Sequence, residues 1–261
     1  MNEPVYERVQ SHLGRLKLSQ MAVCLDGVAE QAAKHEWTYL DFLDQLLDAE
    51  VSARTERDVA MKTKLAHFPF TKTLDQFEFG FQPSISERQI QELATLRFIA
   101  HGENVLLLGP PGVGKTHLAI ALGVAAIQQA VSVYFTTMVD LLDVIHRDAK
   151  EDRLAHRLDT LCRPKLLIID EMGYFTLDRM AAQFLFQLIS RRYLKGSIIL
   201  TSNKSYSDWG DIFADQILAT AILDRLLHVS TTLNIRGQSY RLREKRKAGV
   251  FTELNEPAKE V

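Results

Sequence analysis

Residues 109 to 116 constrain this chain more than any other feature, because they form a glycine-rich loop that ends in lysine and threonine. The loop is Gly109-Pro110-Pro111-Gly112-Val113-Gly114-Lys115-Thr116, a full match to the pattern G-x-x-x-x-G-K-S/T. Glycines lack a Cβ, so backbone N–H groups can close around an anionic phosphate. The lysine adds a cation for the β- and γ-phosphates, and the threonine hydroxyl is a ligand for Mg²⁺. We therefore expect the loop to bind a nucleoside triphosphate.

The loop lies between a predicted strand and a predicted helix, the context in which such loops bind phosphate. Residues 104–108 are a short apolar run, and the stretch from Thr116 through His117 to Gln129 is typical of a helix. The positive end of a helix dipole would then lie under the phosphates. A Gly-Pro turn that merely precedes a lysine is the alternative, and the ordered strand, loop and helix argue against it.

Length and composition fit one large domain, alone or with a small helical piece. The chain has 261 residues, 46% of them hydrophobic, and no apolar run approaches the roughly 20 residues of a membrane span. Its first residues lack the basic and apolar parts of a secretory signal. Cys24 and Cys162 match no metal or redox spacing, and the eight histidines form no ligand cluster. We expect a cytoplasmic protein with no membrane partner and no transition-metal site.

Strands and helices alternate after residue 103, which predicts an α/β fold: a three-layer α/β/α sandwich with a mostly parallel sheet, preceded by a small all-α N-terminal domain. The expected divisions are a helical domain at 1–66, a linker and lead-in helix at 67–103, a core at 104–240 and a basic C-terminal tail at 241–261. The predicted strands cover 104–108, 131–136, 165–170, 197–202 and 229–235, and the predicted helices cover about 115–129, 137–161, 179–194 and 211–227.

Apolar residues recur at helical spacing in the first part of the chain. Residues 5–34 predict helix, and Thr38 with Asp41 forms a capping-box pattern that opens a long helix extending to about residue 64. An aromatic linker follows, and another helix is expected at about 85–101.

Polar side chains that suit nucleotide chemistry follow two of the predicted strands. Asp170 and Glu171 end one strand; beside such a loop, one carboxylate helps to hold Mg²⁺ and a second orients the attacking water. We assign Asp170 to the metal and Glu171 to the water, against the alternative of an acidic strand exit. Asn203 ends the next strand, where it can reach the γ-phosphate or serve only as a turn residue. Arg225, near the end of a helix, is either a solvated cation or a group pointing at a neighbouring subunit's nucleotide.

Net charge does not indicate a nucleic-acid partner, but its distribution is uneven. The whole chain carries a net charge of −2, whereas residues 236–261 contain seven basic and four acidic side chains. The densest basic run, 241–247, is typical of a solvated tail and equally of a contact to a phosphate backbone. Charge alone leaves both interpretations open.

These elements, taken in this order, resemble the AAA+ ATPases over roughly residues 70–235. The chain is most similar to the IstB-type transposition helper proteins, relatives of the helicase loader DnaC and the initiator DnaA. The more specific similarities extend the resemblance to nearly the whole chain: Leu16-Lys17-Leu18 with Met21, Phe68-Pro69, Lys72-Thr73-Leu74-Asp75-Gln76-Phe77 and Arg236-Gly237-Gln238-Ser239-Tyr240-Arg241.

The resemblance implies roles for individual residues. ATP and Mg²⁺ would be held by Lys115, Thr116, Asp170, Glu171 and Asn203 of one protomer. Arg225 would be an arginine finger acting in trans, so that ATP hydrolysis would require assembly. The linker from Thr73 to Phe79, with Phe77, would lie near the adenine, and His117, directly after the loop, is a further candidate for nucleotide binding.

The resemblance also implies partners. Similar proteins form ATP-dependent oligomers on duplex DNA, largely without sequence preference, and recruit and activate a DDE-type (IstA-type) transposase encoded beside them. The stretch 137–161 would carry an extra helix typical of initiator-type relatives, with Arg147, Lys150 and Arg153 as phosphate contacts, unless these form only a solvated helix face. Arg241 and Arg243 of the basic tail are further candidates for DNA contacts.

Two other functions share the same loop. A DnaC-like helicase loader would use its N-terminal helices to grip a hexameric helicase. A small-molecule kinase is less favoured, because Glu171 and Arg225 suit hydrolysis and no phosphoryl-acceptor site is evident in the sequence. Only 26 residues follow Ile235, so we expect the helical lid of many AAA+ proteins to be absent or vestigial. The lid's nucleotide-sensing arginine has no assigned counterpart, with Arg236 and Arg241 as candidates.

Overall fold

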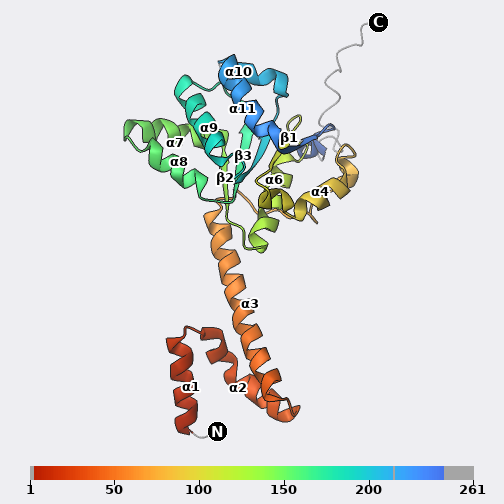
Figure 1. Cartoon of the computed structure of the whole chain (residues 1–261). Coiled ribbons are helices and arrows are strands. Elements are labelled where there is room, and N and C mark those ends of the chain that lie inside the picture. Colours follow the sequence, from red (N-terminus) through yellow and green to blue (C-terminus); the bar gives the residue numbers. More distant parts are fainter. Residues whose placement is uncertain (1–2, 214, 244–261) are drawn as a thin grey trace. The chain divides into compact units, whose positions relative to one another are not determined.

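The computed structural model describes residues 3–213 and 215–243 of the chain (Figure 1). The chain divides into two compact units, of which the first ends at Met61 and the second begins at Lys62. The boundaries expected after residues 66, 103 and 240 stay predictions, and residues 244–261 of the expected basic tail lie outside the described residues. Within the described part of the chain, no helix is both long and apolar enough to cross a membrane.

The first unit consists of helices packed around a small apolar core. The stretch 5–34, predicted to be helical, holds two helices, α1 (Glu3–Arg15) and α2 (Ser19–Lys34), and the chain turns between them at Lys17 with a φ of 57°. The capping box is confirmed: the Thr38 amide donates to the Asp41 carboxylate over 3.0 Å, and the Asp41 amide donates to the Thr38 hydroxyl over 3.2 Å. It opens α3 (Tyr39–Leu65). The core side chains are Leu13, Met21, Leu25 and Leu46.

The second unit is built on a parallel five-stranded sheet, as predicted. Its strands are β1 (Asn104–Leu108), β2 (Val133–Thr137), β3 (Leu166–Met172), β4 (Ser197–Ser202) and β5 (Ser230–Asn234). They lie in the order β2-β3-β4-β1-β5, and every adjacent pair is parallel. Parallel strands all end at the same edge of a sheet, which is where ligands bind in such folds. The segments that follow β1, β3, β4 and β5 therefore meet at one edge.

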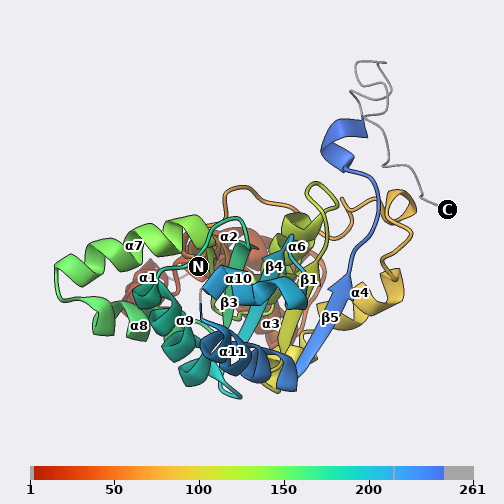
Figure 2. The same ribbon diagram turned by 90° about the horizontal axis from the view of Figure 1, so that it is seen from above.

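Helices cover both faces of the sheet (Figures 1 and 2). On one face, α6 (Lys115–Gln128) lies across the strands and packs against α4 (Glu87–Ala94). The strands are buried on both sides, which explains their nearly continuous apolar runs. The opposite face is covered by α7 (Met138–Lys150), α8 (Leu154–Cys162), α9 (Arg179–Arg192), α10 (Trp209–Phe213) and α11 (Gln216–His228).

Three helices predicted as single elements are each two. The stretch 137–161 breaks between α7 and α8, where Asp152 has a φ of 53°. The stretch 85–101 breaks between α4 and α5 (Arg97–Ala100), where Leu96 has a φ of 62°. In place of one helix over 211–227, the chain forms α10 and α11, and the Asp215 carboxylate caps the N-terminus of α11. Apolar spacing continues across such tight turns, so the sequence pattern alone does not show them.

The linker after α3 is fixed against the sheet. The Phe135 amide of β2 donates to the carbonyl of Ala66 over 2.8 Å, and the Phe68 ring meets the Phe135 ring edge-on at 6.1 Å. A short 3₁₀ helix, η1 (Phe79–Phe81), follows. These contacts hold the linker beside α6, and thereby bring Phe77 to the phosphate loop.

Candidate functional site

The phosphate loop joins β1 to α6, as the sequence predicts. Gly114 precedes the first residue of α6 with a φ of 100°, a conformation that side chains other than glycine rarely adopt. A Cβ at this position would lie 2.6 Å from the Phe77 ring. The loop therefore needs glycine at position 114 for two reasons: its backbone conformation and the close approach of the linker.

Lys115 points back into its own loop. Its Nζ donates to the carbonyl of Gly109 over 2.7 Å and to that of Pro110 over 2.8 Å. Burial lowers the pKa of Lys115 to about 8; the Asp170 carboxylate opposes that shift, the positive charge of Arg241 adds to it, and Glu171 opposes it weakly. The Lys115 ammonium is therefore poorly solvated, and the oxygens of a phosphate in the loop would compete with the two carbonyls as acceptors of its hydrogen bonds.

A chain of hydrogen bonds joins α6, β3 and β4 through one buried carboxylate. The Thr116 hydroxyl lies 3.0 and 2.9 Å from the two carboxylate oxygens of Asp170. The Thr201 hydroxyl donates to Asp170 Oδ1 over 2.5 Å and accepts from the Glu171 amide over 3.0 Å. Asp170 is only 3% exposed. We call these four residues the carboxylate network.

An irregularity in β3 explains how two successive carboxylates serve one site. The register between β3 and β4 shifts between Ile169 and Met172, and Glu171 has a φ of 63°. In a regular strand, successive side chains point to opposite faces. A bulge re-aims a side chain, so Asp170 can meet Thr116 while Glu171 lines the pocket.

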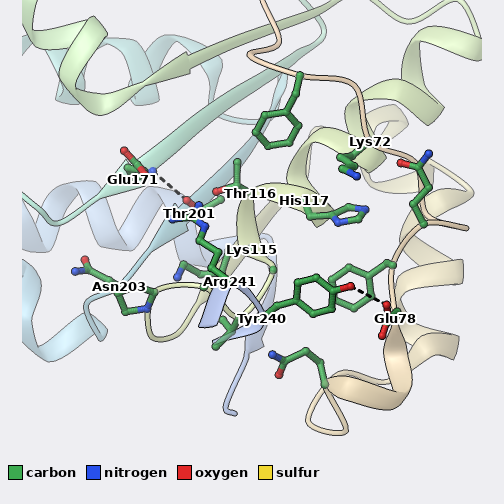
Figure 3. A pocket seen from close by; sticks show the side chains of 18 of the residues that line it. Lys72, Glu78, Lys115, Thr116, His117, Glu171, Thr201, Asn203, Tyr240 and Arg241 are labelled. Atoms are coloured by element: carbon green, nitrogen blue, oxygen red, sulfur yellow. Dashed lines mark hydrogen bonds between the residues drawn. The ribbon is translucent and has the colours of Figure 1, made fainter. Parts of the chain in front are cut away.

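A pocket of about 250 Å³ opens over the phosphate loop and this edge of the sheet (Figure 3). Four segments supply its walls: the loop with the start of α6, the linker, the ends of β3 and β4, and the segment after β5. The lining residues are Phe70, Lys72, Gln76, Phe77, Glu78, Gln82, Pro111, Gly112, Val113, Gly114, Lys115, Thr116, His117, Glu171, Tyr174, Thr201, Asn203, Tyr240 and Arg241.

The pocket brings together most of the residues predicted to bind and hydrolyse a nucleotide. Asp170 lies behind the lining, bonded to Thr116, and the carbonyls of Gly109 and Pro110 hold Lys115. Among the predicted residues, Phe77, Pro111, Gly112, Val113, Gly114, Lys115, Thr116, His117, Glu171 and Asn203 line the cavity.

Aromatic contacts build the linker side of the pocket. The Phe77 ring is 9% exposed and meets the His117 ring edge-on, with centroids 5.2 Å apart. His117 Nε2 in turn lies 2.9 Å from the carbonyl oxygen of Thr73. The linker is therefore attached to the first turn of α6, and Phe77 forms a rigid wall beside the loop.

Arg225 does not belong to the pocket of its own chain. Its guanidinium lies 4.9 Å from the centre of the Phe186 ring and donates to the carbonyl of Ala221 over 3.0 Å. The side chain is thus held on the surface formed by α9 and α11.

The predicted DNA contacts fall into two groups. Arg147 and Lys150 lie in the last turn of α7, and Arg153 precedes α8. Arg147 and Arg153 are 60% and 55% exposed and lie 3.8 and 3.6 Å from the buried carboxylate of Asp148. The pKa of Asp148 is lowered, chiefly by a hydrogen bond from Arg157. This basic cluster (Arg147, Lys150, Arg153 and Arg157) is presented at the turn between α7 and α8.

The structure places Arg241 and Arg243 elsewhere. Arg241 lines the pocket, and Arg243 forms an ion pair with Glu78 while lying over the rings of Phe81 and Tyr240. A contact of Arg241 or Arg243 with DNA stays a prediction. Sequence reasoning named neither Tyr240 nor Thr201 as a site residue, and it expected the linker Thr73–Phe79 near the adenine without giving Gln76 or Glu78 a role of its own; the signals that could have found them were the family-like segments 72–77 and 236–241.

The residues at the loop fit a hard divalent cation. The Thr116 hydroxyl and the Asp170 carboxylate converge within 3.0 Å, and oxygen ligands of this kind suit Mg²⁺, which otherwise takes phosphate oxygens and water. Among residues 3–213 and 215–243, no three His, Cys, Asp or Glu side chains gather into a metal site. A cation here would accordingly depend on the nucleotide for most of its ligands.

This chain is similar to known ATP-binding proteins. The family described as "IstB-like ATP binding protein" matches residues 11–248. An ATP-binding protein of insertion sequence IS21 from Pseudomonas aeruginosa is 50% identical over 94% of this chain and 92% of its own length. Its counterpart in IS5376 from Geobacillus stearothermophilus is 49% identical over 92% and 96%.

Solved structures show the same fold at lower identity. The DnaC helicase loader is 24% identical, with a TM-score of 0.50 over 63% of this chain and 96% of its own. AMPPCP-bound DnaA from Aquifex aeolicus is 20% identical, with a TM-score of 0.52 over 69% and 56%. The second unit therefore has the fold of the P-loop AAA+ proteins.

Nucleotide affinity should fall as the pH rises above about 8. The pKa of Lys115 is lowered to about 8, and a bound anionic nucleotide would raise it, so binding in that range takes up a proton. Titration calorimetry with ATP should show roughly eightfold weaker binding at about pH 9 than at about pH 7.5. Repeating it at about pH 8.5 in two buffers of different ionisation enthalpy should reveal the proton uptake. An affinity that does not change over this range would contradict the prediction.

Proposed function

Since this chain belongs to the family of IstB-like ATP-binding proteins, we propose that it is an ATPase that assembles on duplex DNA and recruits and activates a DDE-type transposase of an insertion sequence. The observation that carries the proposal is the carboxylate network beside the phosphate loop. Thr116 and Glu171 line the same pocket as Lys115, and Asp170 lies behind that lining, bonded to Thr116. That arrangement suits transfer of the γ-phosphate to water.

The residues of the site have separate tasks in the proposed reaction. Lys115 would hold the β- and γ-phosphates, and Thr116 and Asp170 would hold Mg²⁺, which would neutralise phosphate charge. Glu171 orients the attacking water and accepts its proton, and Asn203 reaches the γ-phosphate from the end of β4. Thr201 acts through the others, because its hydroxyl fixes both Asp170 and the backbone of Glu171.

The position of Arg225 supports a proposal of assembly. Because Arg225 lies outside the pocket of its own chain, on the surface of α11, we propose that it completes the pocket of a neighbouring protomer. ATP would then be hydrolysed only between two chains. Hydrolysis would act as a timer on the assembly.

The DNA partner is proposed from the basic cluster at the turn between α7 and α8. Asp148 is buried beneath it, and Arg147 and Arg153 keep most of their exposure while lying within 4 Å of that carboxylate. Cations held in this way can meet a phosphate backbone without reading sequence. The relatives that are half identical belong to insertion sequences, which favours duplex DNA and a transposase over a hexameric helicase as partners. The likeness to the DnaC loader concerns the fold alone.

Glu171→Gln should bind ATP but stop turnover, because the amide cannot accept a proton from water. We expect a nucleotide- and DNA-dependent large species to persist in this variant and to decay with hydrolysis in the wild type. Sedimentation with ATP and duplex DNA, alongside a phosphate-release assay, measures both.

Lys115→Ala is the matched control, since it should lose both binding and assembly. Normal ATP turnover by Glu171→Gln would contradict the role given to Glu171. The absence of any size change with ATP and duplex DNA would contradict assembly.

Arg225→Ala should lose hydrolysis on the order of 10³- to 10⁵-fold, as expected for an arginine finger. Lys115→Ala protomers keep Arg225 but lack a working pocket, whereas Arg225→Ala protomers keep the pocket. Mixing the two inactive variants should therefore restore part of the activity. Arg191→Ala, an exposed arginine on α9, should hydrolyse normally, and a mixture that stays inactive would argue against action in trans.

Replacing both Arg147 and Arg153 by glutamine should weaken binding to duplex DNA of any sequence. The loss of two phosphate contacts should reduce the slope of log affinity against log salt by about 2. Fluorescence anisotropy at several salt concentrations measures this slope. Arg88→Gln, which removes an exposed cation from α4, should leave it unchanged; an unchanged slope in the double variant would exclude the cluster from the DNA interface.

A further inference from the structure

Helices α9 and α11 lie side by side and form the surface that carries Arg225 (Figures 1 and 2). Along α11, the side chains of Ala219, Ile222 and Leu226 are buried. Helical spacing puts position 225 at the flank of that buried face. The Arg225 side chain is therefore half-buried, at the seam where α11 meets α9.

Phe186 supplies the other side of that seam. It is a partly buried residue of α9 that packs against the apolar core, to which its neighbours Phe184 and Leu185 belong. The guanidinium carbon of Arg225 lies over the Phe186 ring, 4.9 Å from its centre. The negative charge of a ring face attracts such a cation. Because this attraction uses no N–H group as a hydrogen-bond donor, it holds the guanidinium in place and leaves its donors free.

Arg225 also differs from the two arginines at the end of α9 in how its charge is met. Arg191 pairs with the Asp159 carboxylate over 2.6 Å, and the buried guanidinium of Arg192 donates to four backbone carbonyls. Arg225 donates to a single carbonyl, that of Ala221. Among residues 3–213 and 215–243, no carboxylate oxygen lies within 4 Å of its guanidinium nitrogens. Its charge is therefore not neutralised by this part of the chain.

We propose that Phe186 is a positioning residue for Arg225: its ring holds the guanidinium at the surface of α9 and α11, ready for the γ-phosphate in the pocket of a neighbouring protomer. This inference rests on the proposed action of Arg225 in trans and adds the residue that prepares it. An arginine bound to a carboxylate would have to break that ion pair first. The contact with a ring is weaker than a charge-assisted hydrogen bond to phosphate, so a neighbour's nucleotide can replace it.

Phe186→Leu keeps an apolar side chain against the core but removes the ring face. A contact of this kind at a partly exposed site corresponds to roughly a fivefold effect, so ATP turnover with duplex DNA at saturating ATP should fall about fivefold. The affinity for ATP should stay unchanged, because Arg225 acts on the pocket of another chain. Phe186→Tyr keeps the ring and should restore turnover. A phosphate-release assay and titration calorimetry measure the two quantities.

Tyr193→Leu is the matched control for packing. The Tyr193 ring also joins the ends of α9 and α11, since it lies 5.8 Å from the His228 ring and its hydroxyl is 2.7 Å from Nδ1 of that histidine. Loss of this contact should leave ATP turnover at the level of the wild type. An equal loss of turnover in Phe186→Leu and Tyr193→Leu would show that packing of the two helices is what matters, and would overturn the inference.

Mixed assemblies test on which side of the interface Phe186 acts. Glu171→Gln protomers keep Arg225 but should not turn over ATP, and Arg225→Ala protomers keep a working pocket, so a mixture of the two should be active. Adding Phe186→Leu to the Glu171→Gln protomers should lower that activity about fivefold. Adding it to the Arg225→Ala protomers should change nothing, because these have no arginine to position.

The outcomes separate this inference from the proposed function. If Arg225→Ala loses turnover while Phe186→Leu does not, the action of Arg225 stands and the role of Phe186 is overturned. If Phe186→Leu lowers the activity of the mixture equally from either protomer, the ring serves the fold and the inference fails. If Arg225→Ala itself hydrolyses ATP normally, the proposed action in trans is wrong and the inference fails with it.

Discussion

The carboxylate of Asp170 is the constraint on which the site depends. It is buried at the end of β3, accepts hydrogen bonds from Thr116 at the start of α6 and from Thr201 at the end of β4, and so ties three elements into one edge of the sheet. A buried carboxylate without such donors would carry a large desolvation cost. The same interaction that makes its burial tolerable aims it at the position where a phosphate-bound cation would lie. The Asp170 side chain therefore both joins three elements of the fold and faces the candidate cation position.

Two further segments complete the pocket at that edge. The linker supplies Phe77, which packs on the first turn of α6, and the segment 236–243 after β5 supplies Arg241, which lines the same cavity. Neither segment belongs to the sheet, and Glu78 of the linker joins them by accepting a hydrogen bond from Tyr240 and pairing with Arg243. The segment 236–243 thus closes one side of the pocket although it belongs to no strand of the sheet.

The sequence predicted the sheet and its ligand-binding edge well, because these depend on local patterns. Buried parallel strands need continuous apolar runs, and the phosphate loop needs its glycines in fixed places, so β1, β3 and β4 were located within two residues of their bounds. Thr38 and Asp41 predicted a helix start for the same local reason. The helix breaks at Leu96 and Asp152 were not predicted, because one residue with positive φ leaves the apolar spacing on either side of it intact.

The sequence by itself determined that Lys115, Thr116 and Asp170 lie at one edge of the sheet, because the phosphate loop and Asp170 both come at the ends of buried parallel strands. Only the tertiary structure decided where Arg241 and Arg225 lie. Arg241 belongs to a basic run that is typical of a solvated tail, and it reaches the pocket because Gly112, Gln82 and Glu78 are bonded to residues 236–243. Arg225 is turned away from its own pocket by packing on Phe186. Both positions result from contacts between segments distant in the chain, and no local pattern encodes such contacts.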